Sequence, residues 1–412
     1  MRAHLMCMTL AVRKMNMSTA TNESPFQYDE LFFSKTDLKG IILSGNSVFR
    51  RVAEFEWEDL IKKPHNIIRH PDMPRAVFYL LWQFLKNGQP IGAFVKNKSK
   101  TGKFYWVFAL AMPTEGGYLS VRLKPGGDLL KLIDKEYQAL RAVEKSKNLS
   151  PEESSQLLLK RIQELGFSNY TEFMTEALVN QLFNRSRERS IEPAAELVCM
   201  GQIKNLGEDI LKSTNKILHA YKATQLVPLN LDIYANRLGE AGSQISVVAD
   251  QYKKLADEIN VDIKTFETLS KEISQQIATS RFYVCASELL DEVSSYLEKE
   301  SKEHEIDGLE EVKHLANTYR SKSMTNVSEV ISVVRKFISI SEGLRSLGTG
   351  LELVRVTGKI ESARLTNSTE AIALLDNLRQ FQVVLSEGLR EVLDCNATMD
   401  HESKKLLTIM KI

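Results

Sequence analysis

The sequence predicts an α+β domain with one antiparallel sheet of five strands, followed by an all-α region of long helices in a bundle or coiled coil. Tryptophan, glycine and proline concentrate in residues 1–127, and no proline follows Pro228. The remainder is rich in Glu, Lys, Leu, Ser and Ala, which favour helices. We therefore predict four segments: a disordered lead (1–25), the α+β domain (26–127), a helical connector (128–195) and a helical region (196–412).

Short apolar runs separated by turn residues define the elements of the first domain. LFFSKTD and GIILSG predict a β-hairpin, and helical spacing follows over residues 46–60. A second helix over 76–85 ends at Asn87-Gly88. Three further strands are predicted at IGAFVKNK, FYWVFALAM and YLSVRL. Two strands, short helices and then three strands are typical of a small α+β domain.

The second half shows apolar residues at helical spacing. LSPEESSQLLLKRIQELGF begins with a capping sequence and predicts a compact helical insert within 150–190. Further on, an apolar seam steps by three and four residues, which is typical of a coiled coil or an antiparallel bundle. Its members are Ile245, Val248, Tyr252, Leu255 and Ile259, and the pattern returns at Val327, Ile331, Val334 and Ile338. From this coiled-coil character we predict a homodimer.

Composition excludes several classes of protein. With 54 basic and 53 acidic residues, the net charge of +1 gives no general attraction to nucleic acid. No apolar run is long enough to span a bilayer, so we predict no transmembrane segment and a cytoplasmic location. The four cysteines are too scattered for a disulfide framework or a metal site. No phosphate-binding, zinc-protease or serine-hydrolase motif is present, and we predict that the protein is not an enzyme.

The most specific string is PHNIIRHPDMP at residues 64–74. Its prolines limit helix on each side and hold Arg69, His70 and Asp72 close together, beside an aromatic core that contains Trp82 and Trp106. Such a cluster suits a ligand with a flat ring and an anionic tail. On spacing alone, a salt-bridged surface turn is the more common explanation.

PHNIIRHPDMP, with LWQFLKNGQP, VKNKSKTGKFYWV and GYLSVR, closely resembles the PAS domain of bacterial aerotaxis receptors over residues 36–122. That family binds FAD without a covalent link and reports its redox state. The resemblance implies FAD contacts at Arg69, His70 and Asp72. It offers Asn46 and Asn97 as further candidates, with Trp82 as a stacking partner or a core residue. The family commonly has a tryptophan where this chain has Ile91. Haem b, ligated by His65 or His70, is the alternative cofactor.

Residues 223–259 resemble the hairpin tip of the methyl-accepting chemotaxis transducer signalling domain, whose surface binds the chemotaxis coupling protein and the histidine kinase. The resemblance implies an apolar partner-binding patch at Leu229, Ile233 and Val248, with Asn230 and Arg237 at its rim. The family's docking glutamate is replaced by Tyr234, and Pro228 is expected to kink the incoming helix. A later string, residues 356–364, faintly resembles the same tip.

These patterns lead to one functional hypothesis and one alternative. The first is a cytoplasmic sensor in which FAD in a PAS domain reports redox state or oxygen, as in aerotaxis, to a chemotaxis kinase complex through the helical region. The alternative is a PAS scaffold whose altered tip binds a partner unrelated to chemotaxis.

Overall fold

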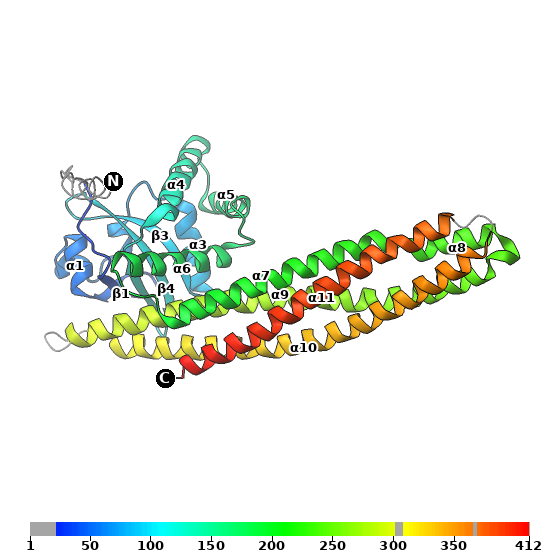
Figure 1. The fold of residues 1–412 in the computed structure, drawn as a ribbon. Coiled ribbons are helices and arrows are strands. Elements are labelled where there is room, and N and C mark those ends of the chain that lie inside the picture. The colour runs from blue at the N-terminus through cyan, green and yellow to red at the C-terminus, as the bar shows by residue number, and fades with distance from the viewer. Residues whose placement is uncertain (1–21, 301–307, 366–368, 412) are drawn as a thin grey trace, which may run out of the picture. The chain divides into compact units, whose positions relative to one another are not determined.

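The computed structural model describes residues 22–300, 308–365 and 369–411, so most of the predicted lead lies outside the described residues (Figure 1). The N-terminal sheet has five antiparallel strands: β1 (Leu31–Asp37), β2 (Ile42–Gly45), β3 (Ile91–Lys98), β4 (Phe104–Thr114) and β5 (Gly117–Leu123). Their order across the sheet is β2-β1-β5-β4-β3. The predicted fold class, this sheet with short helices followed by long helices, is confirmed.

Four short helices connect β2 to β3, namely α1 (Ser47–Ala53), α2 (Trp57–Leu60), the 3-10 helix η2 (His65–Ile68) and α3 (Arg75–Lys86). The single helix predicted over 46–60 is divided, because Glu54 adopts a left-handed conformation with φ of 58° and ends α1. Tertiary contacts hold Glu54 there: its carboxylate accepts hydrogen bonds from Ser99 and Thr101 and pairs with Lys103. Helix α3 begins directly after Pro74.

Successive residues of a strand point to opposite faces of the sheet. In this sheet the two faces carry side chains of different size. One face carries mostly small or polar side chains. Ser34 pairs with Ser120 across β1 and β5, and Ala109 lies opposite Arg122 across β4 and β5. The other face carries large apolar side chains such as Phe33, Phe94 and Phe108, all of them buried. The small residues leave space between the first face and the short helices.

Helices α4 (Gly127–Lys147), α5 (Pro151–Glu164) and α6 (Tyr170–Glu188) follow the sheet. The predicted cap of α5 is confirmed, since Ser150 and Glu153 form a reciprocal capping box. Helix α6 covers the apolar face: the Tyr170 hydroxyl donates to the Gly92 carbonyl oxygen at 3.1 Å. A side chain at Gly92 would collide with the Phe108 ring, which explains the glycine in β3.

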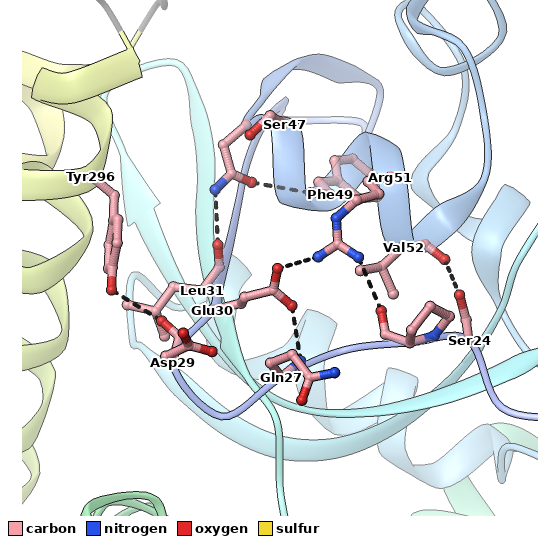
Figure 2. Close-up of polar contacts among 12 residues, drawn as sticks. Ser24, Gln27, Asp29, Glu30, Leu31, Ser47, Phe49, Arg51, Val52 and Tyr296 are labelled. Carbon is pink, nitrogen blue, oxygen red and sulfur yellow. Dashed lines mark hydrogen bonds and ion pairs between the residues drawn. The ribbon is translucent and has the colours of Figure 1, made fainter. Parts of the chain in front are cut away.

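The chain divides into two compact units, and the first unit comprises residues 1–191 together with 289–314. This second segment joins the sheet through specific contacts. The Tyr296 hydroxyl donates to the Asp29 carbonyl oxygen at 3.0 Å (Figure 2). Lys35 of β1 forms an ion pair with Glu311 at 2.9 Å. Arg185 of α6 donates to Glu292 at 2.8 Å, and this contact lowers the pKa of that carboxyl against the opposing effect of burial.

The second unit comprises residues 192–288 and 315–412. Its helices are α7 (Ala195–Thr224), α8 (Val227–Arg237) and α11 (Thr369–Ile409), with the 3-10 helix η3 (Gly239–Gly242) and most of α9 (Ser243–Glu300) and α10 (Leu309–Ala363). Most of the predicted seam is buried inside this unit: Ile245, Val248, Tyr252 and Ile259 are each at most 2% exposed, while Leu255 and Ile338 are partly exposed.

Contacts between neighbouring helices close this unit into a ring of four. Thr214 of α7 hydrogen-bonds Ser270 of α9, and Phe266 of α9 packs edge-on against Phe337 of α10. Lys359 of α10 pairs with Asp376 of α11, and Ser213 of α7 donates to Glu391 of α11. Each helix therefore has two neighbours, as in a four-helix bundle.

The predicted kink and reversal both occur. The α7 helix ends at Thr224, and α8 starts again at Val227 with Pro228 in its first turn. The chain then turns back through η3, where Gly239 has a φ of +60°. A Cβ at Gly242 would lie 2.0 Å from the Ala235 carbonyl oxygen, so this close approach requires glycine.

Across the described ranges, none of the helices is long and apolar enough to cross a membrane.

Candidate functional site

A cavity of about 240 Å³ lies between the small-residue face of the sheet and the short helices. Strand residues that point to this face line it, with side chains from η2 and α3 opposite. The residues that matter for its chemistry are Ser34, His65, Arg69, Trp82, Asn97 and Arg122. The remaining wall is mostly apolar, including Phe78, Leu81 and Val95. A mostly apolar cavity with a few convergent polar groups is typical of a small-molecule site.

Arg122 of β5 is the most deeply buried charged residue that lines this cavity, with 5% of its surface exposed. Its Nη1 donates to the Ser34 hydroxyl at 3.0 Å, and its Nη2 lies 2.8 Å from His65 Nε2. Burial lowers the pKa of Arg122 to about 10, so the guanidinium is still charged at neutral pH. Within the described part of the chain no carboxylate pairs with it. A buried cation of this kind is costly unless an anion or strong acceptor joins it.

His65 is held in one protonation state by Arg122. Burial, reinforced by the Arg122 charge, lowers the pKa of His65 well below its usual range. Since a guanidinium can only donate, His65 Nε2 accepts the hydrogen bond and the ring proton sits on Nδ1. The ring also stacks on Phe49, with centroids 6.0 Å apart. Neutral His65 thus orients the guanidinium without cancelling its charge.

Asn97 of β3 supplies a second donor to the cavity. Its side chain is 3% exposed and lines the cavity, and its Nδ2 has no hydrogen-bond partner among the described residues. Leaving a buried amide donor unsatisfied costs about 1–3 kcal/mol. The cavity therefore offers hydrogen-bond donors to a ligand that is rich in acceptors.

An outer hollow of about 550 Å³ adjoins the cavity and shares Arg69, Phe78 and Trp82 with it. Arg69 stacks over the Phe78 ring at 3.9 Å, and Arg75 and Lys86 also line the hollow. Burial lowers the pKa of Arg69, the charges of Arg141 and Arg75 lower it further, and Glu144 opposes the shift. Positive charge is therefore in excess here, which suits phosphate groups.

Comparison with known proteins identifies the domain that contains this cavity. The family model described as PAS fold matches residues 42–119. Residues 42–119 form most of a PAS domain, and β1 and the end of β5 complete its sheet. The aerotaxis receptor of Escherichia coli (strain K12) is 38% identical over 131 residues, which is 31% of this chain and 26% of the receptor. The methyl-accepting chemotaxis protein TlpB of Bacillus subtilis (strain 168) is 33% identical over 127 residues, 31% of this chain and 19% of that protein.

The chain thus spans only 26% and 19% of the lengths of these two relatives. A solved PAS domain of a protein from Colwellia psychrerythraea covers 23% of the chain with 18% identity and a TM-score of 0.21. The light-state structure of the blue-light photoreceptor Aureochrome1 LOV covers 25% with 19% identity and a TM-score of 0.23. The assignment rests on the family match and the two chemotaxis relatives.

The PAS domain brings three of the six predicted cofactor residues to the cavity: Arg69, Trp82 and Asn97. The other three have different surroundings. His70 Nδ1 lies 3.5 Å from Asp72, which also pairs with Lys96, and none of these residues lines the cavity. Asn46 caps α1: its Oδ1 accepts from Phe49 and Phe33, and its Nδ2 donates to the Leu31 carbonyl oxygen.

Sequence reasoning missed Arg122, the cation at the centre of the PAS cavity. A signal was available, because in YLSVRL the alternation of a strand puts Tyr118, Ser120 and Arg122 on one face. A serine and an arginine on an inward face are unusual in a small core. Across the described ranges, no group of three or more His, Cys, Asp and Glu side chains could hold a metal ion.

The predicted partner-binding residues lie on α8 and α9 in the second unit. Leu229 is 55% exposed and Ile233 is 44% exposed, and Asn230 and Arg237 are exposed as well. Val248 is instead 2% exposed and packs inside the bundle, while its neighbour Val247 is half exposed. The exposed surface of α8 is therefore an apolar patch with a polar rim, without Val248.

Proposed function

We propose that this protein is a cytoplasmic PAS sensor that holds FAD in the cavity of Arg122 and signals its redox state, or oxygen, to a chemotaxis kinase complex. The observation that carries the proposal is the donor set of the cavity. A buried guanidinium that pairs with no carboxylate, and a buried amide donor that has no hydrogen-bond partner, among the residues that the structure describes, face the same space. Two chemotaxis proteins among the relatives support the signalling role over a catalytic one.

The residues fit a flavin. The polar edge of an isoalloxazine ring presents carbonyl oxygens and ring nitrogens, which Arg122 and Asn97 would satisfy as donors. The cavity of about 240 Å³ is smaller than usual ligand pockets, so we place only the ring there. The diphosphate would then extend into the outer hollow, where Arg69, Arg75 and Lys86 supply positive charge. A bound flavin supplies reversible electron transfer with a change of charge at that polar edge.

Arg122 is linked to the opposite side of the sheet through one strand. It donates to Ser34 of β1, and the neighbours of Ser34 in sequence, Phe33 and Lys35, point the other way. Lys35 pairs with Glu311, and a Cβ at Gly308 would touch the Phe33 ring. A shift of Arg122 toward or away from a ligand would therefore displace the strand that contacts residues 308–311 of the same unit.

The chemotaxis coupling protein and the histidine kinase are the partners we propose for the helical region, through the exposed patch of Leu229, Ile233, Asn230 and Arg237. The relatives named as chemotaxis proteins support this assignment. A scaffold for another partner is the second candidate, favoured by Tyr234, which is 5% exposed where the transducer family has a docking glutamate. Sedimentation equilibrium of the full-length chain tests the homodimer that the coiled-coil seam predicts.

Haem b is less well supported as the cofactor. Nε2 of His65 is held by Arg122 at 2.8 Å, and His70 does not line the cavity. An axial ligand would require a free imidazole nitrogen that faces the cofactor.

The absorption spectrum of the purified full-length protein tests the cofactor. We expect the visible bands of an oxidised flavin, their loss on chemical reduction, and FAD rather than FMN released on denaturation. Arg69→Ala should purify with little flavin, whereas Arg50→Ala, a change to an exposed arginine on α1, should retain it. A colourless wild-type protein that takes up no added FAD would contradict the proposal, and a Soret band would favour haem.

Capture of the purified coupling protein by the full-length chain tests the signalling partner. Arg237→Glu reverses an exposed charge at the rim of the α8 patch and should weaken capture. No binding by the wild type, with flavin oxidised or reduced, would favour the scaffold function.

A further inference from the structure

The two halves of the bundle repeat one pattern of buried residues. Buried positions of α7 and α8 recur in α10 at a constant spacing of 127 residues, for example from 200 to 327. In the pairs named next both positions are buried, whereas a few buried positions, such as Tyr221 and Pro228, have part-exposed equivalents in Gly348 and Arg355. The pairs are Met200 and Val327, Ile203 and Val330, Ile210 and Phe337, Thr214 and Ser341, Ile217 and Leu344, Val227 and Val354, and Ala235 and Ser362.

Helices α9 and α11 repeat in the same way with a spacing of 126 residues, as from 259 to 385. The pairs, all buried, are Ile259 and Leu385, Ile263 and Leu389, Phe266 and Val392, Ser270 and Asn396, and Ile273 and Met399. The change of spacing from 127 to 126 corresponds to one residue fewer between the two helices of the second hairpin than between those of the first. A register kept over both helices of a hairpin indicates one hairpin present twice in the chain.

The polar residues of the core follow the same repeat. Thr214 and Ser270 are fully buried and hydrogen-bonded to each other at 2.9 Å. Their equivalents in the second hairpin, Ser341 and Asn396, are also fully buried and polar. Buried polar residues are costly in a helical core, so their recurrence at equivalent positions is a stronger sign of repetition than matching apolar residues.

The repeat closes the bundle within one chain. Phe266 of α9 packs on Phe337 of α10, and the equivalent residues on α11 and α7, Val392 and Ile210, are both fully buried. The apolar seam that predicted a homodimer is thus covered by the chain's own second hairpin. The two hairpins of one chain occupy the positions that two chains would fill in a dimeric bundle.

The exposed surface of the tip repeats as well. Leu226, Leu229 and Ile233 form an apolar stripe on α7–α8, each between 44% and 59% exposed. At the spacing of 127 residues, Leu353, Val356 and Ile360 form an equivalent stripe on α10, each between 40% and 69% exposed. Exposed arginines, Arg237 and Arg364, follow the last residue of each stripe at the same distance. We call these the first and second stripes.

Both stripes lie at the same end of the bundle. Arg237 at the end of α8 forms an ion pair of 3.7 Å with Glu370 at the start of α11, and Figure 1 shows α8 beside the C-terminal end of α10 and the start of α11. Large side chains at i, i+3 and i+7 on an exposed helix are the pattern of a helix that enters an apolar groove.

From this repetition we propose that one chain binds two copies of the same partner, one on each stripe, without a second copy of the chain. The common spacing and the terminal arginine mean that one partner surface, an apolar groove with an acidic rim, fits both. The identity of that partner as the coupling protein rests on the proposed function.

Titration calorimetry of the full-length chain with the coupling protein, together with sedimentation equilibrium, tests the proposal. We expect a monomeric chain that binds two partners. Leu229→Glu with Ile233→Glu should remove one binding event, Val356→Glu with Ile360→Glu the other, and all four changes both events. Val261→Glu is the control, since Val261 is 64% exposed on α9 but lies outside both stripes. Helix content and thermal melting confirm that each variant is folded.

The outcomes separate this inference from the proposed function. A single binding event, lost only in the first-stripe variant, overturns the inference and leaves the proposed function intact. A dimeric wild type that becomes monomeric in the stripe variants also overturns it, since a second copy would then be the occupant. No binding by the wild type overturns the coupling to this partner itself.

Discussion

The two units differ in the surroundings of their buried polar side chains. In the PAS domain, Arg122 and Asn97 face a cavity, one without a carboxylate and the other without any hydrogen-bond partner in the described chain. In the bundle, Thr214 and Ser270 satisfy each other across two packed helices, as do Ser280 and Ser323, whereas Ser341 and Asn396 lie in the packed core without a hydrogen-bond partner among the described residues. Hydrogen-bond donors that face a cavity without a partner point to a bound ligand. Polar groups that pair with each other in a packed core instead fix the alignment of the helices.

Arg122→Met should give the largest effect and sharpen this comparison. Loss of a charged donor to the ligand costs about 1.5–3 kcal/mol, so FAD affinity should fall about 10- to 100-fold. The ligand-free protein should be as stable as the wild type or more stable, because a buried cation with no carboxylate partner in the described chain is replaced by an apolar side chain of similar length. Titration with FAD and urea unfolding of the apoprotein measure the two effects.

Arg122→Lys is the matched control for charge. It keeps the cation but not the fork that donates to Ser34 and His65, so its affinity should fall between those of the wild type and Arg122→Met. A large loss of apoprotein stability in Arg122→Met would show that the arginine supports the fold, and the contrast between the units would fail.

Asn97→Leu should also weaken FAD binding, but less than Arg122→Met does. Removing a neutral donor to the ligand should weaken FAD binding about tenfold. The apoprotein should gain stability, because Nδ2 is buried without a partner in the described chain. Equal FAD affinity in the variant and the wild type would mean that Asn97 does not contact the ligand.

The sequence predicts an element of this structure when the interactions that determine that element are local. Strand alternation and turn residues are local, and they predicted all five strands. The division of the helix over 46–60 was not predicted, because Glu54 is held by Ser99, Thr101 and Lys103 from a distant turn. Asn46 has the chemistry of a ligand contact, but the structure uses it to cap α1.

Periodicity also cannot reveal which surface covers an apolar seam. The residues around Val248 predicted a packed helix, which is confirmed, but the covering helices come from the same chain. The choice of Val248 for a docking patch followed the family pattern, whereas the fold buries it. Arg122 was missed because one charged residue within an apolar strand gives little signal until the neighbouring strands are known.

The Thr214–Ser270 pair tests whether paired polar groups stabilise the packed core of the bundle. Thr214→Val leaves Ser270 buried without its partner and should lower the free energy of unfolding by about 1 kcal/mol or more. Thr214→Val combined with Ser270→Ala removes both polar groups and should recover most of that loss. FAD affinity should not change in either variant. Urea unfolding of the two single variants and the double variant gives the coupling, and additive losses would contradict a paired role.

The smallest effect expected is a pH dependence from His65. Its pKa in the folded protein is lowered by burial and by Arg122, so the native imidazole stays neutral while the unfolded chain takes up a proton below about pH 6.5. Its contribution to stability is therefore complete above that pH and declines on acidification, by at most about 1.4 kcal/mol per pH unit. His65→Gln, whose amide oxygen can still accept from Arg122, should flatten the acid side of a plot of Tm against pH. His401→Gln, a change at an exposed position on α11, should leave it unchanged. Equal slopes in His65→Gln and the wild type would show that the folded imidazole gains a proton as readily as the unfolded one, and that Arg122 does not hold it neutral.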